Sequence, residues 1–186
     1  IQVPYTMEYL VRDNGTVIVT GSIDLTGTKL PELPRFGMRM ELHQPYENLT
    51  YYGRGPFENY IDRYSGAFIG RYEDKVENQF YWYIRPQETG NKTDVRWLTL
   101  LDSGGLGVKI TGLQPISFSA LHFSPEDLDP GLTRKLQHTI DIVPQKNIFL
   151  HVDLKQRGLG GDNSWGMYPH NEYRLLDKKY TYSYMI

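Results

Sequence analysis

The chain has 186 residues, a formal net charge of −2 and no cysteine. This length allows one domain with a sizeable core, and the lack of cysteine excludes disulfides, thiolate zinc sites and cysteine nucleophiles. The charge argues against nucleic acid, which requires a basic face, and no apolar run reaches the roughly 18 residues of a membrane span. Ile1–Leu10 lacks the pattern of a signal peptide. We therefore expect a soluble protein without nucleic-acid or membrane partners, in the cytoplasm or the periplasm.

The composition favours an all-β fold. Aromatic residues make up 13% of the chain, which also holds 18 glycines and 11 prolines. Aromatic side chains suit pleated surfaces, while dense glycine and proline indicate many turns. Period-two alternation predicts about a dozen short strands, spaced as in a β-sandwich or barrel. They cover residues 5–11, 17–19, 36–43, 49–53, 66–72, 80–84, 95–101, 107–112, 116–123, 138–143, 148–155, 173–176 and 180–185.

Turn and cap signals complete this organisation. Asp13–Gly15 and Asp102–Gly105 are tight-turn sequences that predict hairpins. Ser124 can cap a short helix, whose first position suits Pro125. No repeat, low-complexity stretch or linker divides the chain, so we expect a single β-sandwich domain over residues 1–186.

Two charged loops interrupt the strand pattern. Residues 53–63 begin with three helix- and strand-breaking residues and then alternate in charge, and residues 85–97 form a polar connection. Such loops are usually held together by internal ion pairs, and direct ligand contact is the alternative. The weak ligand candidates are Arg54, Glu58, Asp62, Arg63, Glu88 and Arg96.

Several common catalytic motifs are missing. The sequence contains no P-loop, no G-x-S-x-G elbow and no H-E-x-x-H motif. Gly158–Gly161 lacks the spacing of a dinucleotide-binding turn. His151 and Asp153 share one strand face and are a candidate metal pair, with an ordinary surface histidine as the alternative. Retaining glycosidases need two facing carboxylates, and the sequence marks no such pair. We therefore assign no catalytic and no metal-binding residue to this chain.

One loop does suggest binding. Trp165 lies in a glycine-rich stretch whose backbone cannot cover a large ring well. The indole is therefore a candidate platform on which a sugar ring stacks, and the alternative is a hydrophobic plug that turns inward. Trp82 and Trp97 lie within predicted strands, so we expect them in the core. The residues that support Trp165 are Gly160, Gly161, Asp162, Asn163 and Ser164.

Five segments, taken together, resemble a known family. They are Leu33–Gly37, Tyr52–Arg63, Arg85–Trp97, Gly158–Trp165 and His170–Leu175, the last followed by Tyr180–Tyr184. In this order they look like the C-terminal domain (domain 5, the small chain) of glycoside hydrolase family 2 β-galactosidases. The likeness covers nearly the whole chain, and its G-x-G-P-x-E-N-Y-x-D-R and G-G-D-x-S-W motifs are highly specific.

The resemblance carries several expectations. It implies a twisted β-supersandwich like that of galactose mutarotases, truncated at its N-terminus and preceded in the parent by further domains that include a TIM barrel. The two catalytic glutamates and the magnesium and sodium ligands of the family lie mainly on that barrel, so no cofactor is expected here. The family's active-site tryptophan maps onto Trp165, which implies a role in binding the galactoside. Asn163 departs from the acidic residue of many relatives, which leaves the hydrogen bonding of the loop open.

Three functions follow as hypotheses. The first is a domain of a retaining β-galactosidase that hydrolyses terminal β-D-galactosides; its partners are the sugar, the missing domains and a further copy in a homo-oligomer. Here Trp165 forms one wall of the sugar site, and the fragment alone is inactive. The second is a stand-alone carbohydrate-binding β-sandwich. The third, an aldose epimerase, needs a histidine and a glutamate facing one sugar, and the sequence marks no such pair.

Overall fold

The computed structural model describes residues 3–43, 45–129, 131 and 137–186. Its nine-stranded sheet contains antiparallel pairs throughout the described part of the chain. The strands are β1 (Tyr5–Val11), β2 (Val17–Asp24), β3 (Arg35–Leu42), β4 (Asn48–Gly55), β5 (Phe68–Lys75), β6 (Lys92–Leu101), β7 (Gly107–Leu121), β8 (Ile148–Gln156) and β9 (Lys179–Met185). With one short α-helix, α1 (Pro125–Leu128), this confirms the predicted all-β, mostly antiparallel class.

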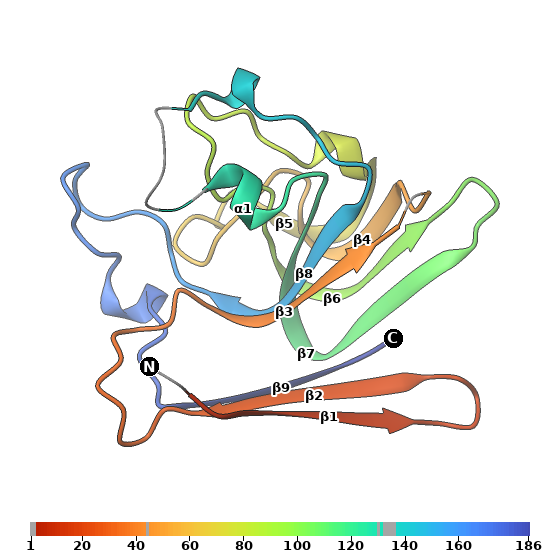
Figure 1. The fold of residues 1–186 in the computed structure, drawn as a ribbon, viewed down its shortest axis with the longest axis horizontal. Coiled ribbons are helices and arrows are strands. Elements are labelled where there is room, and N and C mark those ends of the chain that lie inside the picture. Colours follow the sequence, from red (N-terminus) through yellow and green to blue (C-terminus); the bar gives the residue numbers. More distant parts are fainter. Residues whose placement is uncertain (1–2, 44, 130, 132–136) are drawn as a thin grey trace.

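The sheet branches at its longest strand, β7. Along one side β7 pairs with β6, which continues to β4 and β5. Along the other side, residues 117–121 pair with β8 and residues 111–112 pair with β9. One arm therefore consists of β8 and β3, and a second arm consists of β9, β2 and β1, which runs beneath the first (Figure 1).

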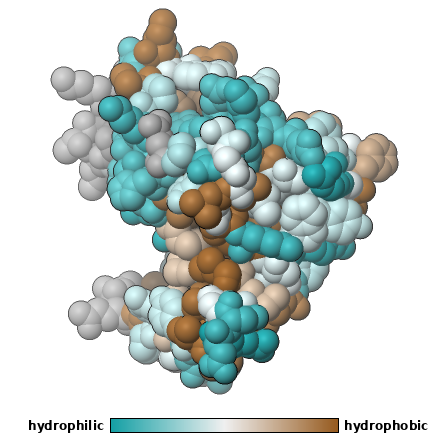
Figure 2. Space-filling model, turned by 90° about the vertical axis from the view of Figure 1, so that its right-hand side faces the viewer, coloured by the Kyte–Doolittle hydropathy of each residue, from teal (hydrophilic) through white to brown (hydrophobic). Residues whose placement is uncertain are grey.

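Aromatic side chains fill the space between these arms. Tyr180, Tyr182 and Tyr184 alternate with more exposed residues along β9, so all three rings lie on the buried face. The Phe36 ring of β3 lies 5.6 Å from the Tyr182 ring, and the Tyr182 hydroxyl donates to the carbonyl of Val152 at 2.9 Å. Figure 2 shows the apolar surface gathered at the waist between the lower arm and the rest of the molecule.

Three predicted strands are absent where the structure describes them. Residues 80–84 are irregular, because Phe80 packs into a small cluster with Phe123 while the neighbouring Tyr81 amide donates to Thr89. Residues 139–141 form a 3₁₀ turn, η3, and residues 171–173 form another, η4. Of the predicted strand 173–176, Leu175 makes an isolated antiparallel bridge with Leu33, and the other described residues of the three predicted segments join no strand ladder.

A further difference concerns β7. The alternation predicted two strands, 107–112 and 116–123, whereas the structure has one strand with an irregularity in its pairing to β6. Val95 pairs with Ile116 and Trp97 with Thr111, so β7 carries extra residues around Pro115, which has no amide hydrogen to donate. These differences explain why about a dozen predicted strands become nine in the described chain.

The helix prediction is confirmed. The Ser124 hydroxyl accepts from the Asp127 amide at 3.1 Å, while the Asp127 carboxylate accepts from the Ser124 amide at 2.7 Å, which is a complete capping box. Another short 3₁₀ turn, η1 (Val76–Asn78), follows β5. In the part of the chain that the structure describes, no helix has both the length and the apolar character needed to cross a bilayer.

Candidate functional site

The loop that carries Trp165 lies between β8 and η4, at the edge of the molecule (blue, at the left of Figure 1). Trp165 is 93% exposed, so the alternative of an inward-facing plug is wrong. Its amide donates to the Asn163 side-chain oxygen at 2.8 Å, and Gly166 follows with φ +95°. An asparagine oxygen accepts this bond as an aspartate oxygen does, so Asn163 in place of an acid preserves the local turn.

A buried glutamate that the sequence did not single out closes the base of this loop. Glu32 accepts from Arg174 Nε at 2.5 Å and also pairs with Arg157, and these two arginines bracket the loop. The amide of Gly158 donates to the Tyr173 carbonyl at 2.8 Å, which joins the same two ends. Burial opposes ionisation of Glu32, but the bonds from both arginines outweigh it and lower its pKa. Glu32 therefore acts as a charged clasp.

Further contacts organise the far side of the loop. The ring of Tyr168 lies beneath the guanidinium groups of Arg174 and Arg157, at 4.9 and 5.6 Å from its centroid. His170 Nε2 lies 2.8 Å from Asp162 Oδ1, and this bond raises the pKa of His170. Residues 162 and 166–172 line an open hollow next to these contacts. The loop thus combines an exposed indole with a set of defined contacts at its other residues, Tyr168 among them.

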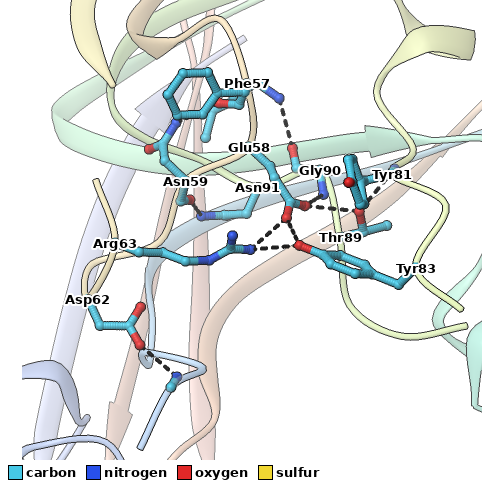
Figure 3. A network of polar contacts seen from close by, with 12 residues as sticks. Phe57, Glu58, Asn59, Asp62, Arg63, Tyr81, Tyr83, Thr89, Gly90 and Asn91 are labelled. Carbon is cyan, nitrogen blue, oxygen red and sulfur yellow. Dashed lines mark hydrogen bonds and ion pairs between the residues drawn. The ribbon is translucent and has the colours of Figure 1, made fainter. Parts of the chain in front are cut away.

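The first charged loop, residues 53–63, is organised around Glu58 (Figure 3). Its carboxylate accepts from Arg63 Nη2 at 2.5 Å, Thr89 Oγ1 at 2.9 Å and the Gly90 amide at 2.7 Å, and also from the Tyr83 hydroxyl. Glu58 and Arg63 therefore face each other and the second charged loop. The structure shows a network that joins the two loops at this point.

Asp62 lies away from this network and points toward the tryptophan loop (Figure 3). Its Oδ2 accepts from the Gly160 amide at 2.7 Å. The remaining candidates meet within the protein: Arg54 Nε lies 2.5 Å from Asp94 Oδ2, and Arg96 donates to the Asp94 carbonyl. The structure thus connects Asp62 alone of these six candidates to the loop of Trp165, among the contacts of the described residues.

The sixth candidate, Glu88, belongs to a cluster around Arg35. Arg35 Nη2 lies 2.9 Å from Glu88 Oε1, and Arg35 Nε lies 3.0 Å from Asp153 Oδ2. Asp153 is fully buried, and burial raises its pKa to about 7 although Arg35 opposes the shift. His151 Nδ1 is 2.9 Å from Arg35 Nη1, and burial together with nearby arginines lowers the His151 pKa to about 4.

This cluster bears on two interpretations of the sequence, the candidate metal pair of His151 and Asp153 and the aldose epimerase, which needs a histidine and a glutamate facing one sugar. His151 and Asp153 both contact Arg35, a cation, and among the described residues no three His, Cys, Asp or Glu side chains come close enough to hold a metal ion. His151 and Glu88 line one cavity of about 440 Å³, so the structure brings together a histidine and a glutamate that the sequence did not pair. Arg35 contacts both of them, through a hydrogen bond with His151 and an ion pair with Glu88, so the three side chains form one polar cluster.

The expectation that Trp82 and Trp97 belong to the core is wrong for Trp82. Its side chain is 58% exposed and meets the rings of Phe80 and Phe123 edge to face. Trp97 on β6 is partly buried, with Lys109 Nζ 5.7 Å from its ring centroid. An exposed tryptophan outside the loop of Trp165 provides a matched control for the experiments below.

The Glu58 network predicts a pH-dependent stability. Burial opposes ionisation of Glu58, but hydrogen bonds from Tyr83, Gly90, Arg63 and Thr89 outweigh it, and its pKa falls below the ordinary 4.5. The folded state therefore holds its proton more weakly than the unfolded state, so the stabilisation is complete above about pH 4.5 and is lost as the pH falls through the folded pKa.

We therefore expect Glu58→Gln to reduce the free energy of unfolding by about 2–3 kcal/mol at pH 7, with the difference narrowing below about pH 4.5. Urea denaturation between pH 3 and 7 measures both values. Glu8→Gln is the control, because Glu8 is exposed on β1 and its loss is expected to have little effect. An equal loss at pH 3 and pH 7 would contradict the role of the charge.

Sequence comparisons identify the family of this chain. Residues 2–186 match the family model described as beta galactosidase small chain. The chain is 36% identical over 179 residues to a beta-galactosidase of Priestia megaterium, covering 96% of this chain and 17% of that protein. It is 35% identical over 188 residues to a beta-galactosidase of Streptococcus thermophilus, covering 100% of this chain and 17% of the relative. A beta-galactosidase of Lactobacillus delbrueckii subsp. bulgaricus is 35% identical over 176 residues, 94% of this chain and 16% of its own length.

The chain therefore spans about one sixth of these relatives, within the C-terminal part of each of them. The family model covers nearly every residue, including both charged loops and the tryptophan loop. On this match, the chain belongs to the β-galactosidase small-chain family.

Proposed function

We propose that this chain is the C-terminal domain of a retaining β-galactosidase of glycoside hydrolase family 2, with a mutarotase-like β-supersandwich, and that Trp165 forms an aromatic wall of its sugar site. The observation that carries the proposal is the 93% exposure of an indole on a loop that is clasped at its base. The described residues leave almost all of this large apolar ring uncovered. The relatives that match 96% and 100% of this chain are beta-galactosidases. We therefore propose a β-galactoside as the sugar that Trp165 contacts.

The contribution of Trp165 is binding and not bond cleavage. A sugar that lies flat against the indole is stabilised by about 1–2 kcal/mol, in the ground state and the transition state alike. Stacking transfers no proton and forms no bond, so the nucleophile and the acid/base must be carboxylates elsewhere. We place these groups, and the magnesium and sodium sites that the family implies, in the remaining domains of the parent.

A comparison of the isolated chain with its parent tests this proposal. We expect the full-length parent to hydrolyse lactose and a chromogenic β-galactoside with retention at the anomeric carbon, as followed by NMR. The 186-residue chain is expected to show neither hydrolysis nor measurable heat of binding with lactose, because one wall does not make a site. Sugar binding by the isolated chain as tight as that of the parent would instead support a stand-alone carbohydrate-binding module.

A further inference from the structure

The tryptophan loop has a lateral contact in addition to its clasped base. Asp62 lies at the end of the first charged loop, and its Oδ2 accepts a hydrogen bond from the amide of Gly160 at 2.7 Å. Gly160 lies five residues before Trp165 in the same glycine-rich stretch. Among the hydrogen bonds of the described residues, this is the one that joins the tryptophan loop to the first charged loop.

Asp62 packs against the backbone of two glycines, and only one of these positions is too close for a side chain. A Cβ atom at position 158 would lie 2.6 Å from the Asp62 carboxyl carbon, closer than real contacts allow. A Cβ at position 160 would lie 3.4 Å from Asp62 Oδ2, which is an ordinary contact. The glycine at position 158 is therefore explained by the approach of the carboxylate, and position 160 offers a natural control.

Asp62 is itself held in place by its neighbours in sequence. The amide and carbonyl of Asn59, a fully buried residue, exchange bonds of 2.8 Å each with Asn91, and the Asn59 side-chain oxygen accepts from the Thr93 amide at 3.0 Å. On the other side of Asp62, Arg63 binds Glu58 and lies over the ring of Tyr60. The Asp62 carboxylate therefore has a defined position, because the residues on both sides of it are held. Its hydrogen bond with the Gly160 amide then fixes the position of the tryptophan loop at Gly160.

We propose that Asp62 is a positioning residue, which fixes the position of the loop that carries Trp165 by accepting the hydrogen bond from Gly160. This inference rests on the proposed function only for its effect on sugar binding. Without Asp62 the loop is tied at its base by Glu32 and within itself by the pair of Asp162 and His170. Its backbone at Gly160 then gains freedom, and the indole loses the fixed orientation that a flat stack needs.

Two measurements on the full-length parent test the inference. Hydrogen exchange of the peptide over residues 158–167 reports the position of the loop directly and needs no sugar. We expect Asp62→Ala to increase exchange in this peptide and to raise KM for lactose by about 5- to 10-fold, with little change in kcat. Asp62→Asn keeps an acceptor oxygen and should restore most of both values.

The variants at glycine supply an independent arm that leaves the carboxylate in place. Gly158→Ala should displace the loop and reproduce the exchange pattern of Asp62→Ala, while Gly160→Ala keeps the amide donor and should resemble the native protein. Asp24→Ala is the remote control, because the Asp24 carboxylate binds the Thr26 amide and Lys179 at the sheet edge. Trp165→Ala combined with Asp62→Ala should raise KM no more than Trp165→Ala alone.

The outcomes separate the two proposals. Unchanged exchange in Asp62→Ala would overturn the positioning role, even if the added Cβ of Gly158→Ala increases exchange by displacing the loop. A KM that rises in Trp165→Ala but stays native in Asp62→Ala would overturn it as well. Increased exchange in Asp62→Ala, together with a native KM in both Asp62→Ala and Trp165→Ala, would uphold the positioning of the loop. The same result would overturn Trp165 as a wall of the sugar site.

Discussion

Trp165→Ala in the full-length parent is expected to raise KM for lactose about 5- to 30-fold and to leave kcat within about 2-fold of the native value. In the proposed function, the exposed indole stabilises substrate and transition state by the same stacking energy, about 1–2 kcal/mol. Losing interactions of this kind weakens binding without slowing the chemical step. Steady-state kinetics with lactose, together with calorimetric titration of a substrate analogue, measures both effects.

Trp82→Ala is the matched control for this experiment. Trp82 is also exposed, at 58%, but it lies on the irregular segment after β5 and packs against Phe80 and Phe123. We expect a loss of stability in this variant and a native KM. Trp165→Phe should recover part of the affinity, because a smaller ring still stacks. Native KM in Trp165→Ala, or the same rise in Trp82→Ala, would show that the loop does not form the sugar wall.

Arg35→Ala is expected to have the largest effect on stability, about 3–5 kcal/mol in the free energy of unfolding. Arg35 is the cation beside Asp153, which is fully buried, and it also contacts Glu88 and His151. Above about pH 7, where Asp153 is ionised, removal of Arg35 leaves a carboxylate in the core without a compensating charge. The midpoint of urea denaturation of the 186-residue chain measures the loss.

The effect should depend on pH in a defined direction. Burial raises the Asp153 pKa to about 7, so between about pH 4 and 7 the folded state binds a proton that the unfolded state has released. The contribution of Asp153 to stability therefore falls as the pH rises through this range, and the loss of stability in Arg35→Ala should be larger at pH 8 than at pH 5. Adding Asp153→Asn to this variant should recover much of the loss at pH 8, because it removes the unpaired charge.

Arg39→Ala is the control on the same strand. Arg39 pairs with Glu126 at 2.8 Å, and both side chains are largely exposed, so the expected loss is below about 1 kcal/mol. Equal losses in Arg35→Ala and Arg39→Ala would contradict the assignment of Arg35 as the partner of a buried charge.

Strand positions and the capped helix were predictable because they depend on near neighbours. Residues 180–185 were predicted as a strand and lie in β9, and the Ser124 cap formed as expected. The same local signals failed at residues 80–84, where aromatic composition favours a strand but Phe80 and Tyr83 instead contact a small core and Glu58. Pairing partners are a property of the whole sheet, so composition alone could not exclude that strand.

In the candidate site, too, local sequence predicted some features and the tertiary structure decided others. The glycine-rich sequence around Trp165 led to two alternatives, an exposed indole or an indole that turns inward as a hydrophobic plug, because flexible backbone cannot cover a large ring. Only the tertiary structure decided between these alternatives and revealed what holds the loop. Glu32 binds Arg157 and Arg174, and Asp62 binds Gly160, across separations of about 100 residues or more. Such contacts arise when distant strands are brought together by the branched sheet, and no local pattern encodes them.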